Sequence, residues 1–125
     1  MAEGKVLGIG GVFVRSGNPA ALAEWYREHL GFVVTESGQP DPDGNYVWMQ
    51  DAGPTVYSFF RANSDYFAED RQVMINLRVE GLDALLARLE NAGIAVSHRE
   101  EMDGVGRFAR IHDADGNPLE LWEPS

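Results

Sequence analysis

A single carboxylate interrupts an apolar run near the end of the chain, where Glu120 stands between Leu119 and Leu121. A carboxylate in such a place can bind a cation, exchange a proton with a substrate or close an internal salt bridge. His112, eight positions earlier in the stretch HDADGNPLELWEP, is the other candidate for acid–base chemistry, because histidine titrates near neutral pH. The two side chains are therefore the candidate catalytic residues, and which chemistry they perform depends on the elements that position them.

The composition limits the kinds of partner. The chain has 125 residues, 44% of them apolar, which suits one domain with a real core. A net charge of −10 disfavours nucleic acid, whose phosphates need Lys and Arg, and it permits a cationic ligand. The absence of cysteine excludes disulfides and Cys-ligated zinc. No apolar run suits a membrane span and the N-terminal stretch does not resemble a secretory signal, so a cytoplasmic protein is expected.

Two segments are predicted to be helices. Residues 17–31 begin with Asn18 as a possible N-cap and Pro19 at the first helical position, and they end with Gly31, which suits a left-handed C-cap. Residues 81–93 carry apolar side chains at helical spacing and end in a glycine. The side chains of this second stripe are Leu82, Leu85, Leu86 and Leu89.

The rest of the chain favours strands separated by turns and by one polar connection, residues 63–71. The predicted strands are residues 7–15, 32–37, 45–51, 55–62, 73–79, 95–101, 107–113 and 117–123.

The order strand, helix, strand, strand, strand thus occurs twice, and such a duplication is a stronger signal than any single motif. We expect an α+β domain over residues 1–125, made of two βαβββ modules, about 7–62 and 73–123. Each module would be a curved mixed sheet with its helix on the outer face, and the two sheets together would enclose a groove.

This order of elements, with WYREHLGF after the first strand and DADGNPLELWEP at the end, resembles the vicinal oxygen chelate superfamily. That superfamily includes glyoxalase I, extradiol dioxygenases and bleomycin-resistance proteins. The resemblance covers nearly the whole chain and implies the fold, a small-molecule site in the groove and a homodimer. It says little about the activity, because one fold hosts many functions.

Alternation along the strands predicts which side chains face the groove. Ala109, Ile111, Leu119 and Leu121 are expected on the helix side, as are the apolar residues of 73–79. The phase of residues 55–62 stays open, and two alternatives hold for the aromatic side chains: they contact a ligand or they fill the space. The predicted ligand-binding residues are Phe13, Trp48, Asn76, Arg78, Phe108, Arg110, His112, Glu120 and Trp122.

In metal-dependent members of the superfamily, inward His and Glu residues from four strands hold the ion. Here Gly11 and Met74 stand at two of these positions and an aromatic residue of 55–60 at the third, so Glu120 is the only ligand of this type retained. Glycine has no side chain to donate and methionine is a soft ligand, poorly suited to an oxygen-rich site. We therefore expect no metal cofactor. The expected partner of Glu120 is Arg110, Arg78, His112 or a ligand cation.

Two hypotheses concern small molecules. The first is a metal-free binding protein that holds a flat or cationic molecule, with Trp48 and Trp122 stacking on it and Glu120 facing its charge. The alternative is a metal-dependent lyase, isomerase or dioxygenase acting on an oxygen-rich substrate. A variant of this alternative is a metal-free enzyme that uses Glu120 or His112 as acid or base.

A third hypothesis is a non-catalytic interaction module whose groove is filled by its own side chains. In that case Tyr66 and Phe67, in the polar connection, either mark a contact surface or anchor the loop that contains them.

Overall fold

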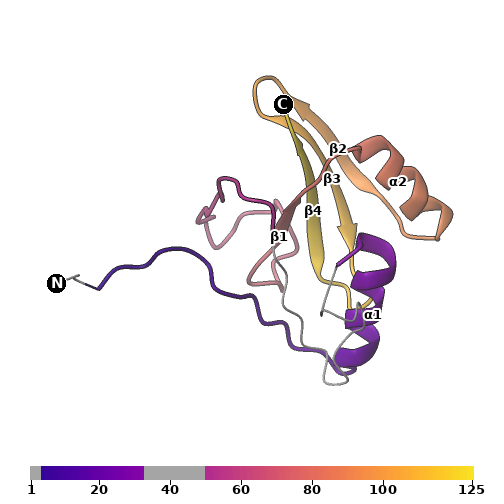
Figure 1. Cartoon of the computed structure of the whole chain (residues 1–125), viewed down its shortest axis with the longest axis horizontal. Helices are drawn as coiled ribbons and strands as arrows, with labels where there is room; N and C mark the ends of the chain where they lie inside the picture. The colour runs from indigo at the N-terminus through magenta and orange to yellow at the C-terminus, as the bar shows by residue number, and fades with distance from the viewer. Residues whose placement is uncertain (1–3, 33–49) are drawn as a thin grey trace.

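The computed structural model describes residues 4–32 and 50–125, which form one mixed sheet with two helices (Figure 1). The sheet order is β1-β4-β3-β2. The strands are β1 (Ile75–Arg78), β2 (Ser97–Met102), β3 (Gly106–His112) and β4 (Pro118–Pro124). β1 runs parallel to β4, and the other neighbouring pairs are antiparallel. The predicted α+β class is therefore confirmed.

Helix α1 (Pro19–Leu30) has the predicted ends. The side chain of Asn18 accepts a hydrogen bond from the backbone N–H of Ala21 at 3.2 Å, which satisfies one of the free N–H groups of the first turn. At the other end Gly31 adopts the left-handed conformation, with φ of 70°. Leu22 and Ala23 are the buried residues of this helix.

Helix α2 (Leu82–Asn91) covers the same face of the sheet as α1. Its leucine stripe is buried at three of the four predicted positions, and Leu85 is partly buried. These leucines pack on Ala109 and Ile111 of β3 and on Leu119 and Leu121 of β4. The predicted strand phase is thus confirmed in β3 and β4, because alternate residues of both strands form this core.

The antiparallel pairing of β3 with β4 brings Arg110 directly opposite Glu120. At the other edge, β2 pairs with β3 through a register shift between Ser97 and Glu100. His98 lies in this irregularity and is the non-glycine residue with positive φ, 49°, in the described part of the chain. The sheet therefore places Arg110 and Glu120 side by side on the face that the helices leave open.

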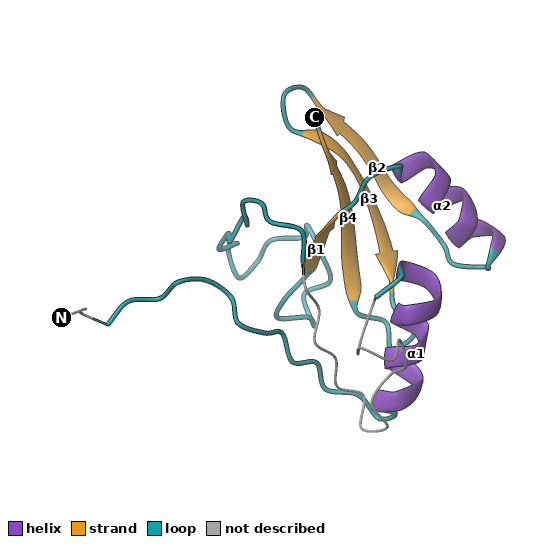
Figure 2. Cartoon of the chain, in the orientation of Figure 1, coloured by secondary structure: helices purple, strands orange, loops and turns teal. Residues whose placement is uncertain are grey.

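Two predicted strands are wrong. Residues 7–15 form no strand and are almost entirely exposed, with Phe13 97% accessible (Figure 2). Residues 55–62 likewise form no strand. Alternation predicts a strand only where another strand lies beside it, and the described sheet ends at β1. Glycines at three positions of 7–15 further weaken its preference for extended pairing.

Smaller differences concern the start of β1 and the first module. Val73, expected in the core, is 65% exposed because β1 begins only at Ile75. The predicted strands 32–37 and 45–51 lie largely outside the described residues, so the two-module division stays a prediction. Neither described helix has both the length and the apolar character needed to cross a membrane.

Candidate functional site

Glu120 lies at the centre of the open face of the sheet and is 8% exposed. Its Oε1 accepts a hydrogen bond from the side-chain amide of Asn76 in β1, at 2.8 Å. Its Oε2 accepts a hydrogen bond from the hydroxyl of Tyr66, which belongs to the connection before β1. Burial, and then the hydrogen bond to Glu120, raise the pKa of Tyr66 to about 12, so this phenol is a neutral donor at physiological pH.

Arg110 lies beside this carboxylate and is only 4% exposed. Its Nη2 is 4.0 Å from Glu120 Oε2, the outer limit of an ion pair. The guanidinium carbon lies 5.1 Å from the centre of the Tyr66 ring, within cation–π distance. Its Nε is buried and has no hydrogen-bond partner among the residues that the structure describes. Among the described residues, Arg110 is therefore a buried cation with an unpaired Nε–H and a carboxylate only at the limit of an ion pair.

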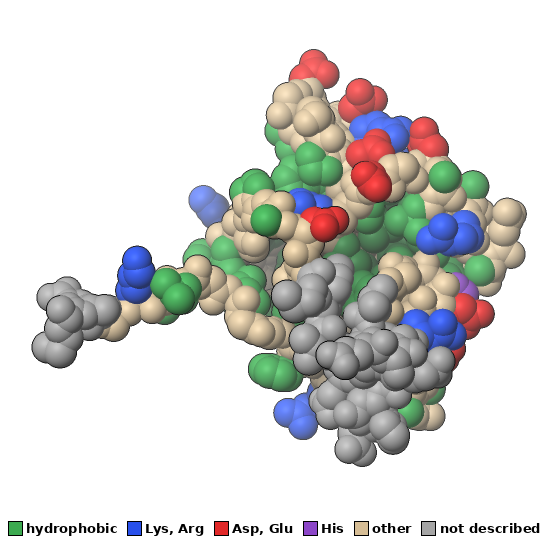
Figure 3. Space-filling model, in the orientation of Figure 1, with side chains coloured by type: hydrophobic (Ala, Val, Ile, Leu, Met, Phe, Trp, Pro, Cys, Tyr) green, Lys and Arg blue, Asp and Glu red, His purple; other side chains and the backbone are tan. Residues whose placement is uncertain are grey.

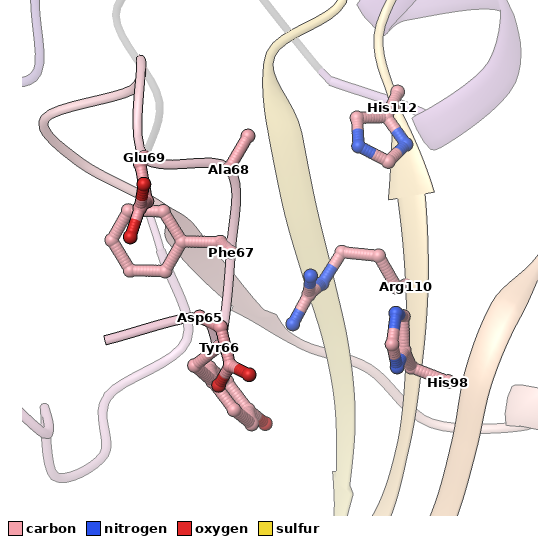
Figure 4. A pocket seen from close by; sticks show the side chains of 8 residues that line it. All are labelled: Asp65, Tyr66, Phe67, Ala68, Glu69, His98, Arg110 and His112. Atoms are coloured by element: carbon pink, nitrogen blue, oxygen red, sulfur yellow. The ribbon is translucent and has the colours of Figure 1, made fainter. Parts of the chain in front are cut away.

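A hollow of about 280 Å³ lies between β3 and the connection before β1 (Figure 4). In Figure 4 Arg110 extends from the sheet towards the segment of residues 65–69, and His98 and His112 lie on the strand side of the hollow. Its lining residues are Asp65, Tyr66, Phe67, Ala68, Glu69, His98, Arg110 and His112. Of the predicted ligand-binding residues, the hollow thus contains Arg110 and His112.

The aromatic part of the open face is a stacked pair. The rings of Phe108 in β3 and Trp122 in β4 lie 6.1 Å apart and nearly parallel, at 4°. The indole N–H of Trp122 donates to the backbone carbonyl of Val105 at 3.0 Å, which fixes the ring. Arg78, one of the expected partners of Glu120, instead donates a hydrogen bond to the backbone carbonyl of Asp51, at 2.7 Å.

Two predicted site residues are not brought to this face by the described structure. Phe13 is almost fully exposed and does not line the hollow, because the segment that carries it does not join the sheet. Trp48 lies outside the described residues. Within residues 4–32 and 50–125, no three His, Asp or Glu side chains come together in a way that could hold a metal ion.

A family model for the glyoxalase-like domain matches residues 11–122. The chain belongs to the glyoxalase-like domain family. This match confirms the resemblance to the vicinal oxygen chelate superfamily. No protein of curated function matches the sequence.

Solved structures share the fold of this glyoxalase-like domain. A glyoxylase/bleomycin resistance protein/dioxygenase domain from Frankia sp. EAN1pec is 22% identical, with 97% of this chain and 100% of that chain covered and a TM-score of 0.58. TnmS3, an antibiotic binding protein from Streptomyces sp. CB03234, is also 22% identical, with 94% and 100% covered and a TM-score of 0.52. A glyoxalase family protein from Bacillus anthracis is 16% identical, with 99% and 100% covered and a TM-score of 0.62.

A second polar cluster of the glyoxalase-like domain holds the turn between β3 and β4. Asp113 is 5% exposed and accepts hydrogen bonds from the backbone N–H groups of Asp115 and Asn117. It also accepts from the hydroxyl of Tyr26 in α1, at 2.5 Å. Burial, together with this hydrogen bond, raises the pKa of Tyr26 far above its usual range. The turn and α1 are therefore fixed to each other by one carboxylate.

The sequence did not single out the roles of Tyr66 and His98. The sequence predicts Tyr66 only as a loop anchor or a contact residue, yet its hydroxyl donates to the carboxylate of Glu120. No sequence pattern selects His98, which lines the hollow at the register shift of β2. For Tyr66, the available signal in the sequence is an aromatic residue within an otherwise polar connection, residues 63–71.

Proposed function

We propose that this glyoxalase-like protein binds a small, flat molecule on the open face of its sheet and that it does so without a metal at Glu120. The observation that carries the proposal is the engagement of both oxygens of this carboxylate. Asn76 donates to one and Tyr66 to the other, so each oxygen already accepts a hydrogen bond from a neutral donor of the chain itself.

The residues at the sequence positions where the superfamily has its metal ligands also fit a metal poorly. Gly11, at one of the positions where a ligand would be expected, has no side chain, and Met74, at another, would offer a soft thioether. One carboxylate is too little for a catalytic metal, which in the case of zinc usually has three protein ligands. We therefore derive no metal-dependent step for this protein.

The stacked rings of Phe108 and Trp122 support a flat ligand. Both rings are partly exposed on the open face, and aromatic faces bind planar molecules by offset stacking. Trp48, outside the described residues, stays a proposed ligand contact. The description of TnmS3 as an antibiotic binding protein is consistent with a small-molecule ligand in a protein of this fold.

We also propose that the protein is a homodimer. Apolar side chains of the segments before α1 and before β1 are exposed, including Leu7 at 87%, Phe13 at 97% and Phe59 at 90%. Such a concentration of exposed apolar surface is typical of an interaction site. A second copy of the chain would cover it.

Calorimetric titration with planar aromatic compounds tests the binding function. Trp122→Ala is expected to weaken binding about tenfold or more, because the stacking surface is lost, and Trp122→Phe to retain most of it. Trp25→Phe, in α1 on the helix side of the sheet, is the matched control and should leave the affinity unchanged. Equal affinities of Trp122→Ala and the unmodified protein would contradict the proposal.

Metal analysis tests the other half of the proposal. Protein purified without chelators is expected to carry no stoichiometric divalent metal, and Glu120→Gln should not change its metal content. Stoichiometric Ni, Zn, Mn or Fe that disappears in Glu120→Gln would contradict the proposal and favour a metal-dependent lyase, isomerase or dioxygenase.

A further inference from the structure

The guanidinium of Arg110 has more donors than the described residues provide acceptors. It is 4% exposed, its Nε has no partner, and its nearest carboxylate oxygen is 4.0 Å away. Burying a charged group without hydrogen-bonded partners is costly. A fold that retains such an arginine has a place for an additional acceptor beside it.

Glu120 does not fill that place. Its two oxygens already accept hydrogen bonds from Asn76 and Tyr66, and no direct hydrogen bond joins it to Arg110 within the described residues. The carboxylate therefore compensates the charge of Arg110 in part, through space, while the directed donors of the guanidinium stay available.

The hollow beside Arg110 adds further donors. His98 and His112 lie on its strand side, and each imidazole can donate at least one N–H. Asp65 and Glu69, on the opposite wall, carry negative charge, but both residues are exposed, where water and salt screen a charge strongly. Arg110 is thus the buried charged side chain among the residues that line the hollow.

We infer that this hollow takes an anionic acceptor group of the ligand, a carboxylate or a phenolate on an aromatic frame, and that Arg110 binds it. The inference rests on the proposed function and names the ligand's chemistry. A guanidinium matches a carboxylate in a two-pronged, charge-assisted pair. A cationic ligand, which the acidic composition permits, would be repelled by the buried Arg110 and would find carboxylates only on the exposed wall, at Asp65 and Glu69.

Three naphthalene derivatives with one ring system and different head groups test the inference by calorimetry. They are 2-naphthoate, 2-naphthamide and 2-naphthylmethylammonium. With the unmodified protein, 2-naphthoate is expected to bind about tenfold more tightly than the other two, as one charge-assisted pair allows. This comparison needs no variant, so it does not depend on whether a substitution at Arg110 folds.

Variants then assign the preference to Arg110. Arg110→Gln should abolish the preference for 2-naphthoate and leave 2-naphthamide binding within about twofold, whereas Arg110→Lys should keep part of it because the charge stays and the fork is lost. Arg99→Gln is the matched control, since Arg99 follows His98 in β2 but pairs with Glu90 of α2 at 2.7 Å. It should retain the full preference.

The outcomes separate this inference from the proposed function. Equal or tighter binding of the amide or the ammonium compound, or a preference that persists in Arg110→Gln, would overturn the inference and leave small-molecule binding in place. No binding of any of the three up to millimolar concentration would contradict both.

Discussion

Tyr66 donates its hydroxyl to Glu120 across 54 positions of the sequence. The contact joins the connection before β1 to the middle of β4, and it places an aromatic ring against the guanidinium of Arg110. The carboxylate on the open face is thereby satisfied by a neutral phenol and an amide. The same contact forms one wall of the hollow, so the arrangement of this site depends on a segment that contains no regular secondary structure.

Replacing Tyr66 with Phe tests the structural importance of that contact. The substitution keeps the ring and removes one hydrogen bond to a charged group, which should lower the free energy of unfolding by about 1 kcal/mol for a partly exposed donor. Urea denaturation followed by circular dichroism measures the change. Tyr57→Phe is the matched control, since Tyr57 is 72% exposed and should change stability very little.

Tyr66 also gives the stability a dependence on alkaline pH. Its pKa is raised to about 12 in the folded protein, so folding favours the neutral phenol. The stabilisation is complete below the ordinary tyrosine pKa of about 10 and is lost as the pH rises towards 12. The unmodified protein should therefore lose more stability than Tyr66→Phe between these values. Parallel curves for the two proteins would show that the contact does not form in solution.

The sequence was sufficient for elements whose side chains repeat at a regular spacing. The leucines of α2 and the alternation of β4 each define one buried face, and both faces meet in the core. It was insufficient for residues 7–15, because alternation does not reveal whether a partner strand lies beside a segment. It was also insufficient for the pair formed by Tyr66 and Glu120, since no local pattern relates positions so far apart.

For the candidate site, the sequence predicted which face of the sheet a residue occupies but not its hydrogen-bond partners. Strand phase placed Arg110, Asn76 and Glu120 on one face, and the structure brings these three together. Strand phase alone could not determine that Asn76 and Tyr66, and not Arg110, donate hydrogen bonds to the carboxylate of Glu120. Which donors reach Glu120 depends on the lengths of the side chains and on the conformation of the connection before β1.

Asp113 is expected to be the more sensitive carboxylate for folding. Asp113→Ala leaves the N–H groups of Asp115 and Asn117 and the hydroxyl of Tyr26 without their acceptor, so we expect a loss of about 3 kcal/mol. Tyr26→Phe removes one of these bonds and should cost about 1 kcal/mol. Asp115→Ala, at the exposed neighbour, is the control and should have a small effect. Similar denaturation midpoints for Asp113→Ala and this control would contradict the assignment.

Acid should weaken the end of the sheet where β2 and β3 join, where acidic side chains gather (Figure 3). The Arg107 guanidinium, with the backbone N–H of Leu82, holds the pKa of Glu123 below its usual value. A carboxyl with a lowered pKa in the folded state stabilises above its unfolded pKa of about 4.3, and this contribution is lost as the pH falls through the folded pKa.

Arg107→Gln tests this dependence, because the variant lacks the guanidinium that lowers the pKa of Glu123. The unmodified protein should lose more stability than the variant between pH 6 and pH 3, while carboxylates that do not contact Arg107 contribute equally to both; Asp83, its second partner, loses the same guanidinium. Arg88→Gln, the same change of charge on α2, should behave like the unmodified protein. Identical pH profiles for Arg107→Gln and the unmodified protein would be the contrary result.

Exposed apolar side chains before α1 and before β1 predict self-association. Light scattering should give a mass near twice the 13.8 kDa of one chain at micromolar concentration. Phe13→Ser and Phe59→Ser should each weaken the dimer about tenfold or more, since large aromatic side chains dominate such interfaces. Met102→Ser is the control, because Met102 is 46% exposed at the far end of the sheet. A mass of one chain at all concentrations would contradict the proposed dimer and would leave this apolar surface open to a different partner.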